Sequence, residues 1–159
     1  MAAVDLYLDP VCPFSWVTAR WLLVAAQSTH TQVALRQMSL AVLNEGQDAD
    51  AKQQDMMERS TRLGRLFAAA VAERGPDAFA GLYDSIGRRI HVRREDLTAA
   101  GIREALAENG LEERLAEALD DSGFDDRSGG RTKPAKMPWA TRPAARSSRS
   151  MAARSPDRS

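Results

Sequence analysis

The stretch Val4-Asp5-Leu6-Tyr7-Leu8-Asp9-Pro10-Val11-Cys12-Pro13-Phe14-Ser15-Trp16 decides the fold of this chain. Its first five residues predict a short strand that leads into Asp9-Pro10. Pro13 stands where a helix begins, because proline fits the first helical turn. Apolar or small residues then recur at helical spacing, namely Phe14, Val17, Thr18, Trp21, Leu22 and Ala25. The stretch therefore predicts a strand-to-helix junction at Cys12.

A second predicted strand follows the helix and completes one βαβ unit. Residues 33–40 contain Val33 and Leu35 in alternation with other residues, which is typical of a strand. Strand, helix and strand within about 35 residues have the size of a βαβ unit, whose two strands are parallel.

The middle of the chain predicts a block of helices and no further strand. Residues 49–74 form a long helical pattern that Gly75-Pro76 ends, and Pro76 can open the next helix. Asp96 or Thr98 can cap a third helix, which Gly110 closes before a fourth begins. The apolar positions of the first two helices are Met56, Leu63, Leu66, Phe67, Ala70, Val71, Phe79, Leu82, Tyr83, Ile86 and Ile90.

Length and composition exclude several classes of protein. The 159 residues suit one domain, and 43% apolar with 28% charged residues indicate a globular chain. One cysteine excludes an internal disulfide framework and a four-cysteine zinc site. Because no membrane span and no secretory signal are visible, we expect a cytoplasmic protein with no membrane partner.

The last part of the chain differs in composition from the rest. The 22 basic and 22 acidic side chains balance overall, but residues 127–159 contain seven Arg and two Lys against one acid, Asp157. After Phe124 there is no Val, Ile, Leu or Phe. Such a segment buries too little apolar surface to offset its ordering entropy, so we expect a disordered basic tail. Nucleic-acid binding would need more than this charge, and a solvated tail is the simpler interpretation.

Cys12 is the candidate nucleophile of the chain. If Pro13 is the first helical residue, Cys12 is the N-cap, and its sulfur faces unpaired N–H groups and the positive end of the helix dipole. Both favour the reactive thiolate over the thiol. Ser15 lies one turn further on, near enough to donate its hydroxyl to the sulfur. The alternative is a small buried hydrophobic residue, which is common for a free cysteine.

These residues resemble the DsbA-like thioredoxin-fold proteins, and most closely their mycothiol-dependent nitroreductase branch. The resemblance rests on residues 9–16 with Ala19-Arg20-Trp21-Leu22, on Met38-Ser39-Leu40-Ala41-Val42-Leu43-Asn44-Glu45 and on Gly87-Arg88-Arg89-Ile90-His91. It covers about residues 4–126 and implies a thioredoxin-fold domain over 1–126 with a helical insertion at about 49–120.

The resemblance also implies a chemistry and a set of site residues. The cysteine would form mixed disulfides, with no bound cofactor and with mycothiol, a low-molecular-weight thiol, as co-substrate and a small molecule or disulfide as substrate. Cys12, Pro13, Phe14 and Ser15 would form the catalytic turn, and Asn44 would lie near its groove. Trp16 is expected in the core or in the wall of that groove and is assigned with Asn44 to substrate binding. No metal is expected, because His30 and His91 lack metal-ligand spacing and no acidic cluster joins them.

The sequence departs from the family pattern in two places. Ser15 replaces the second cysteine of Cys-Pro-Trp-Cys, so an external thiol must resolve the mixed disulfide. A serine near this position also resembles the pattern of the related kappa-class glutathione transferases and isomerases, so that class of enzyme stays open. The later strand pair and its cis-proline loop are missing. Back-translation of residues 127–159 in another reading frame yields a segment similar to this part, so we expect the tail to be a frameshift product.

The sequence thus predicts an α/β protein: an incomplete thioredoxin-like fold with a βαβ start, an all-helical insertion and a disordered tail. Its expected function is that of a thiol–disulfide oxidoreductase whose activity the truncation puts in question. The alternative is a non-catalytic remnant, or a helical binding module with a basic arm. The residues leave the oligomeric state open, with a homodimer as one option.

Overall fold

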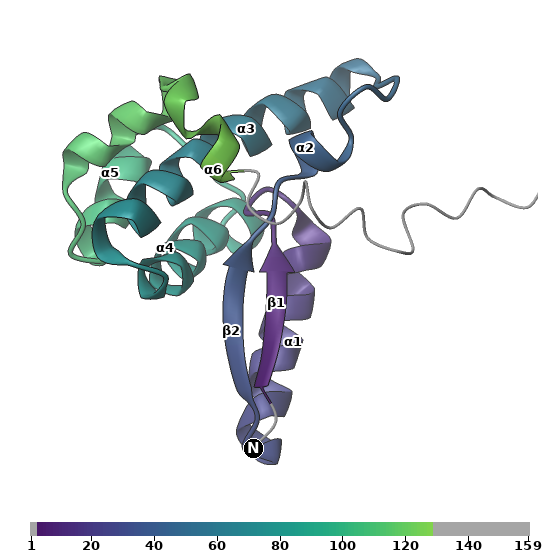
Figure 1. Ribbon diagram of the computed structural model, residues 1–159, viewed down its shortest axis with the longest axis vertical. Helices are drawn as coiled ribbons and strands as arrows, with labels where there is room; N and C mark the ends of the chain where they lie inside the picture. Colours follow the sequence, from purple (N-terminus) through teal and green to yellow (C-terminus); the bar gives the residue numbers. More distant parts are fainter. Residues whose placement is uncertain (1–2, 129–159) are drawn as a thin grey trace, which may run out of the picture.

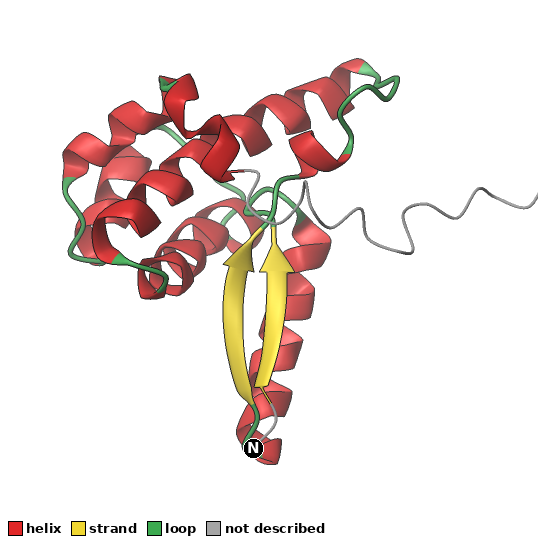
Figure 2. Ribbon diagram, viewed as in Figure 1, coloured by secondary structure: helices red, strands yellow, loops and turns green. Residues whose placement is uncertain are grey.

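The computed structural model describes residues 3–128 and joins a small parallel sheet to a block of helices (Figures 1 and 2). β1 (Ala3–Leu8) pairs in parallel with β2 (Gln32–Gln37). Helix α1 (Pro13–Thr29) connects them and runs alongside both strands (Figure 1). Within the described range the sheet has these two strands. The predicted α/β class with a βαβ start is confirmed.

The second strand ends earlier than the sequence predicts. β2 stops at Gln37, and residues 40–43 form the short helix α2 (Leu40–Leu43) instead of the end of a strand. The Ser39 side chain caps this helix by accepting a hydrogen bond from Val42 N at 3.4 Å. A hydroxyl at an N-cap accepts a hydrogen bond from a backbone N–H of the first helical turn, which stabilises a helix start at this position.

The helical block contains the remaining elements. These are α3 (Ala51–Arg74), α4 (Asp77–Gly87), the π-helical turn η1 (Arg88–Val92), α5 (Ala99–Glu108), the 3₁₀ helices η2 (Glu113–Asp120) and η3 (Ser122–Phe124), and α6 (Asp125–Ser128). Of the two predicted caps of the third helix, Asp96 and Thr98, the cap is Thr98, whose side chain accepts a hydrogen bond from Gly101 N. Gly110 after this helix has a positive φ of 67°. The predicted fourth helix is the 3₁₀ helix η2 rather than an α-helix.

The core of the protein lies between these helices and the carboxyl end of β1. Leu66 and Phe67 of α3 and Leu82 and Ile86 of α4 are completely buried, and Leu8 at the end of β1 is 1% exposed. Most apolar positions predicted for these two helices are thus in the core. Burial at this junction anchors the strand that leads into the Cys12 turn.

The buried face of α1 is not the predicted one. Phe14, Val17 and Trp21 are 80%, 66% and 68% exposed, whereas Trp16 and Ala19 are buried. α1 carries apolar residues on both sides, so spacing alone could not select the side that packs against the sheet and α4. The exposed side has no covering element among residues 3–128.

The end of the described range bears on the expected domain boundary and on the expected tail. α6 extends to Ser128, two residues beyond the expected boundary at 126, and the Ser128 side chain is buried. The rest of the expected tail, residues 129–159, lies outside the described residues. Its disorder and its origin in a frameshift therefore stay predictions. No helix between residues 3 and 128 is long and apolar enough to cross a bilayer.

Candidate active site

Cys12 is the N-cap residue of α1, as the sequence predicts. Its backbone is extended, with φ −76° and ψ 116°, and Pro13 begins the helix. The Sγ atom accepts a hydrogen bond from Ser15 N at 3.5 Å, and Cys12 O accepts from Trp16 N at 3.2 Å. The thiol therefore faces the unpaired donors at the positive end of the helix dipole. The donor to sulfur is the Ser15 backbone, so a role for its hydroxyl stays a prediction.

A buried carboxylate holds the turn that carries Cys12. Asp9 is 1% exposed, and its oxygens accept hydrogen bonds from Val11 N at 2.8 Å, Leu40 N at 2.7 Å and Ser60 Oγ at 2.5 Å. Burial raises the pKa of Asp9 above its usual value, and the three hydrogen bonds oppose this effect. Asp9 thus ties the turn to α2 and α3 at once.

The other side of the turn rests against an aromatic group. His91 Nε2 lies 2.9 Å from Pro10 O, and the His91 ring stacks on Trp16 with 5.8 Å between ring centroids. Trp16 also contacts Tyr83 at 5.8 Å. A Cβ atom on Gly87 would collide with the Trp16 ring, so only glycine lets α4 approach so closely. His91 therefore lies half-buried beside the turn that carries Cys12 rather than on an open surface.

The pKa values of two groups beside this turn, His91 and Tyr83, are shifted from their ordinary values. Burial lowers the pKa of His91 below its usual value, the hydrogen bond to Pro10 opposes this, and Arg59 adds to the lowering. Burial also raises the pKa of Tyr83 well above its usual value, with Cys12 and Asp9 contributing. The Tyr83 hydroxyl is buried with no hydrogen-bond partner among the described residues. Perturbed groups of this kind gather at functional sites, and here they surround one turn.

A pocket of about 640 Å³ opens at Cys12. Its apolar wall comes from the turn at Cys12, α2 and the start of α3, and includes Phe14, Leu40, Met56 and Met57. Amide side chains complete it, namely Asn44, Gln47, Gln53 and Gln54. Its volume and mixed lining are typical of a small-molecule site.

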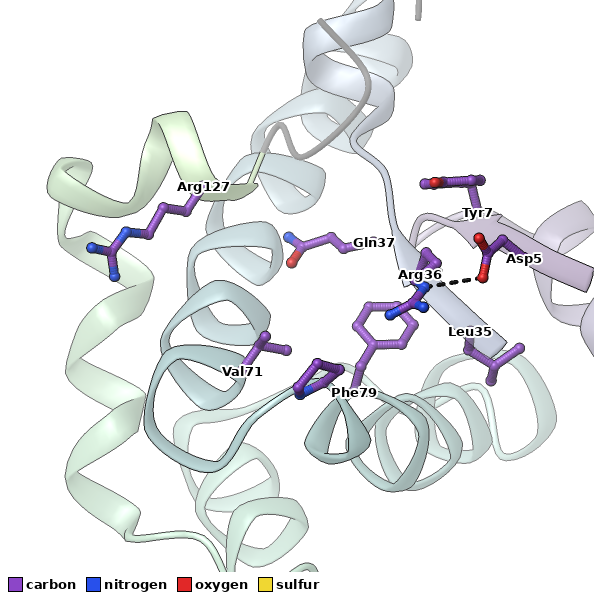
Figure 3. Close-up of a pocket in the computed structure, with 9 residues that line it drawn as sticks. Asp5, Tyr7, Leu35, Arg36, Gln37, Val71, Phe79 and Arg127 are labelled. Atoms are coloured by element: carbon purple, nitrogen blue, oxygen red, sulfur yellow. Dashed lines mark hydrogen bonds and ion pairs between the residues drawn. The ribbon is translucent and has the colours of Figure 1, made fainter. Parts of the chain in front are cut away.

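Two further cavities of the described part of the chain have linings without Cys12. One of about 400 Å³ lies by the sheet, where Asp5 and Arg36 form an ion pair at 3.2 Å (Figure 3). Tyr7 of β1, Val71 of α3 and Phe79 of α4 also line this cavity (Figure 3). Another, of about 780 Å³, lies between α1, β2 and α4. Within residues 3–128, no cluster of three His, Cys, Asp or Glu side chains could hold a metal ion.

The structure brings most of the predicted site residues together. Cys12, Pro13, Phe14 and Asn44 line one pocket, with Ser15 one turn away. Trp16 packs behind the turn and lines a different cavity. Their functional roles stay predictions.

Sequence reasoning missed the polar support of the turn. Ser60 is 1% exposed and donates to Asp9, and its Oγ also accepts from Ala41 N at 3.2 Å. A serine at an otherwise apolar position of a long helix was the available signal. Its partner lies far away in sequence, which no local pattern reveals.

A family model described as "Rv2466c-like: Mycothiol-dependent nitroreductase Rv2466c" matches residues 11–135. The match covers well over half of the chain and includes the Cys12 turn, Asn44 and His91. The N-capping cysteine and the parallel βαβ unit with helices after it agree with the DsbA-like thioredoxin fold of that family. This chain therefore belongs to the Rv2466c-like family of mycothiol-dependent nitroreductases.

Proposed function

We propose that this protein is a thiol–disulfide oxidoreductase in which Cys12 is the only protein nucleophile and mycothiol is the co-substrate. The observation that carries the proposal is the position of Cys12 Sγ, at the N-terminus of α1 and in the wall of the pocket of about 640 Å³. A helix N-terminus favours the thiolate, which is the attacking species.

The proposed reaction proceeds through a mixed disulfide. The Cys12 thiolate attacks one sulfur of a disulfide substrate, forms a bond to it and expels the other sulfur as a thiolate. A second low-molecular-weight thiol then attacks the mixed disulfide, which releases a new disulfide and restores Cys12. Because Ser15 stands where a second cysteine could resolve the bond, the resolving thiol comes from solution.

The lining of the pocket supports a polar, uncharged co-substrate. Mycothiol joins a cysteine to a neutral sugar–inositol unit that is rich in hydroxyl groups. Asn44 Nδ2 donates to Leu40 O at 2.8 Å, and Gln54 Nε2 donates to Ala49 O at 3.0 Å. Both bonds use the amide nitrogen, so the amide oxygens are left as acceptors for hydroxyl donors.

The alkylation rate of Cys12 tests the proposal. We expect iodoacetamide at neutral pH to modify the folded chain at least about tenfold faster than the same chain unfolded in urea. Incubation with oxidised mycothiol should add one thiol per chain by mass spectrometry, and excess reduced mycothiol should remove it. Cys12→Ser is the blank, and equal rates for folded and unfolded chains would favour the non-catalytic remnant.

A second variant separates this function from the transferase alternative. Ser15→Cys should close an internal disulfide with Cys12 and release the mixed disulfide without added thiol, whereas Ser15→Ala should retain the wild-type requirement. The kappa-class alternative needs Ser15 and a bound thiol instead of Cys12. This alternative predicts that Cys12→Ser keeps the transferase or isomerase activity and that Ser15→Ala loses it.

A further inference from the structure

We propose that Glu45 and Asp48 make the Cys12 pocket select against anionic thiols and disulfides and in favour of neutral or cationic ones. The inference rests on the proposed function, because it takes Cys12 as the reacting sulfur. It assigns to two residues of the loop between α2 and α3 a role in substrate choice.

The charged side chains that line the pocket are both acidic. Glu45 and Asp48 stand on the stretch that joins α2 to α3, and no lysine or arginine belongs to the lining among the described residues. Both side chains are exposed at the rim. A substrate that reaches Cys12 from solution therefore passes two carboxylates.

Among the described residues, neither carboxylate has a basic ion-pair partner. No basic residue of α3 lines this pocket, and Arg59 and Arg62 line a separate cavity. The two charges at the rim therefore act on any charged substrate.

The loop that carries these acids is held in place at both ends. Glu45 N donates to Val42 O at 3.4 Å, and Gln47 N donates to Asn44 O at 3.1 Å. At the other end Asp50 forms a capping box with Gln53 at the start of α3. A loop fixed in this way keeps its carboxylates at the mouth of the pocket.

The helix dipole acts in the opposite direction but is weaker. The N-terminus of α1 is equivalent to about half a positive charge and attracts anions toward Cys12. Two full negative charges at the rim outweigh it for a ligand whose charged group remains near the mouth. For exposed charges separated by roughly one Debye length, we expect an effect of about two- to fivefold in rate per charge at low salt.

Three symmetrical disulfides that differ in charge test the inference. Cystamine is cationic, bis(2-hydroxyethyl) disulfide is neutral and 3,3′-dithiodipropionate is anionic. In each reaction Cys12 forms one mixed disulfide and releases one thiolate, so the rate is read by mass spectrometry of the modified chain. Each rate is divided by the rate of 2-mercaptoethanol with the same disulfide, which removes the intrinsic reactivity of the probe.

Matched variants remove charge at the rim or at a distance. The test protein is Glu45→Gln/Asp48→Asn. The control is Glu113→Gln/Glu117→Gln, which makes the same change in net charge at exposed positions of η2. Circular dichroism verifies that each variant is folded.

The inference predicts that the reaction rate of wild type depends on the charge of the probe and that the rim variant loses this dependence. Wild type should react with the cationic probe at least about fivefold faster than with the anionic one, and added salt should shrink this ratio. The rim variant should lose most of the preference, and the η2 variant should keep it. An unchanged preference in the rim variant, or no preference in wild type, would overturn the inference. Reaction of every probe no faster than with urea-unfolded chain would instead overturn the proposed function.

Discussion

At the scale of single residues, a close contact between a glycine and a tryptophan supports the turn that carries Cys12. Gly87 ends α4 directly against the Trp16 ring, and a side chain there would occupy the same space. Trp16 in turn stacks on His91, whose ring nitrogen Nε2 lies 2.9 Å from Pro10 O. The absence of one methyl group thus sets the position of the residues behind Cys12.

Gly87→Ala should therefore destabilise the protein and disturb the turn. We expect a loss of about 1–3 kcal/mol in the free energy of unfolding, because the added methyl group overpacks a closed contact. Urea denaturation followed by tryptophan fluorescence measures it. Gly101→Ala on α5 is the control, since its new Cβ would meet only ordinary contacts, and it should be neutral or slightly stabilising. Equal effects of the two substitutions would contradict this account.

At the scale of elements, α1 is a helix with apolar residues on two sides, of which residues 3–128 cover one. Trp21 and Val24 are each 68% exposed, whereas Trp16 is 8% exposed on the opposite side. Exposed apolar side chains on one helix face form a patch of the kind that promotes association. The patch lies beside a two-stranded sheet that is small for independent stability.

The two tryptophans of α1 should respond in opposite ways to the same substitution. Trp21→Gln should lower light scattering at high protein concentration and leave the melting temperature nearly unchanged, because the side chain is already in water. Trp16→Gln should lower the melting temperature strongly, since it removes a buried ring and leaves a polar group in its place. A Trp21→Gln protein that aggregates as readily as wild type would rule out this face as the cause.

At the scale of the whole molecule, buried Asp9 and half-buried His91 make stability depend on pH in opposite senses. The pKa of His91 is lowered in the folded state, chiefly by burial. Below its ordinary value of 6.5 the unfolded chain binds more protons, so this contribution is complete above 6.5 and is lost as the pH falls. The pKa of Asp9 is raised, so its contribution is complete below 3.8 and declines as the pH rises through the raised value.

Urea unfolding at a series of pH values separates these contributions. His91→Gln should flatten the rise in the free energy of unfolding between about pH 5 and 7. Asp9→Asn should remove the decline that begins at acidic pH, although it also weakens the bonds to Leu40 N and Ser60 Oγ. Parallel curves for wild type and both variants would show that neither group governs the pH dependence.

The sequence alone determined the local features of this protein. Pro13 after Cys12 marks the start of α1, and Gly110 closes α5, because caps and turns depend on residues a few positions apart. For the start of α5 the sequence offered Asp96 or Thr98, and the structure selects Thr98. The resemblance that Cys12 and its neighbours carry also led to the correct family.

Only the tertiary structure decided which side of α1 is buried and which distant residues meet at the turn. Asp9 contacts Ser60 across 51 positions, and His91 contacts Pro10 across 81. These contacts depend on how helices pack around one core, and packing selects among sides of a helix that local periodicity leaves equivalent. The pocket at Cys12 exists for the same reason, since its walls come from three elements that only the fold brings together.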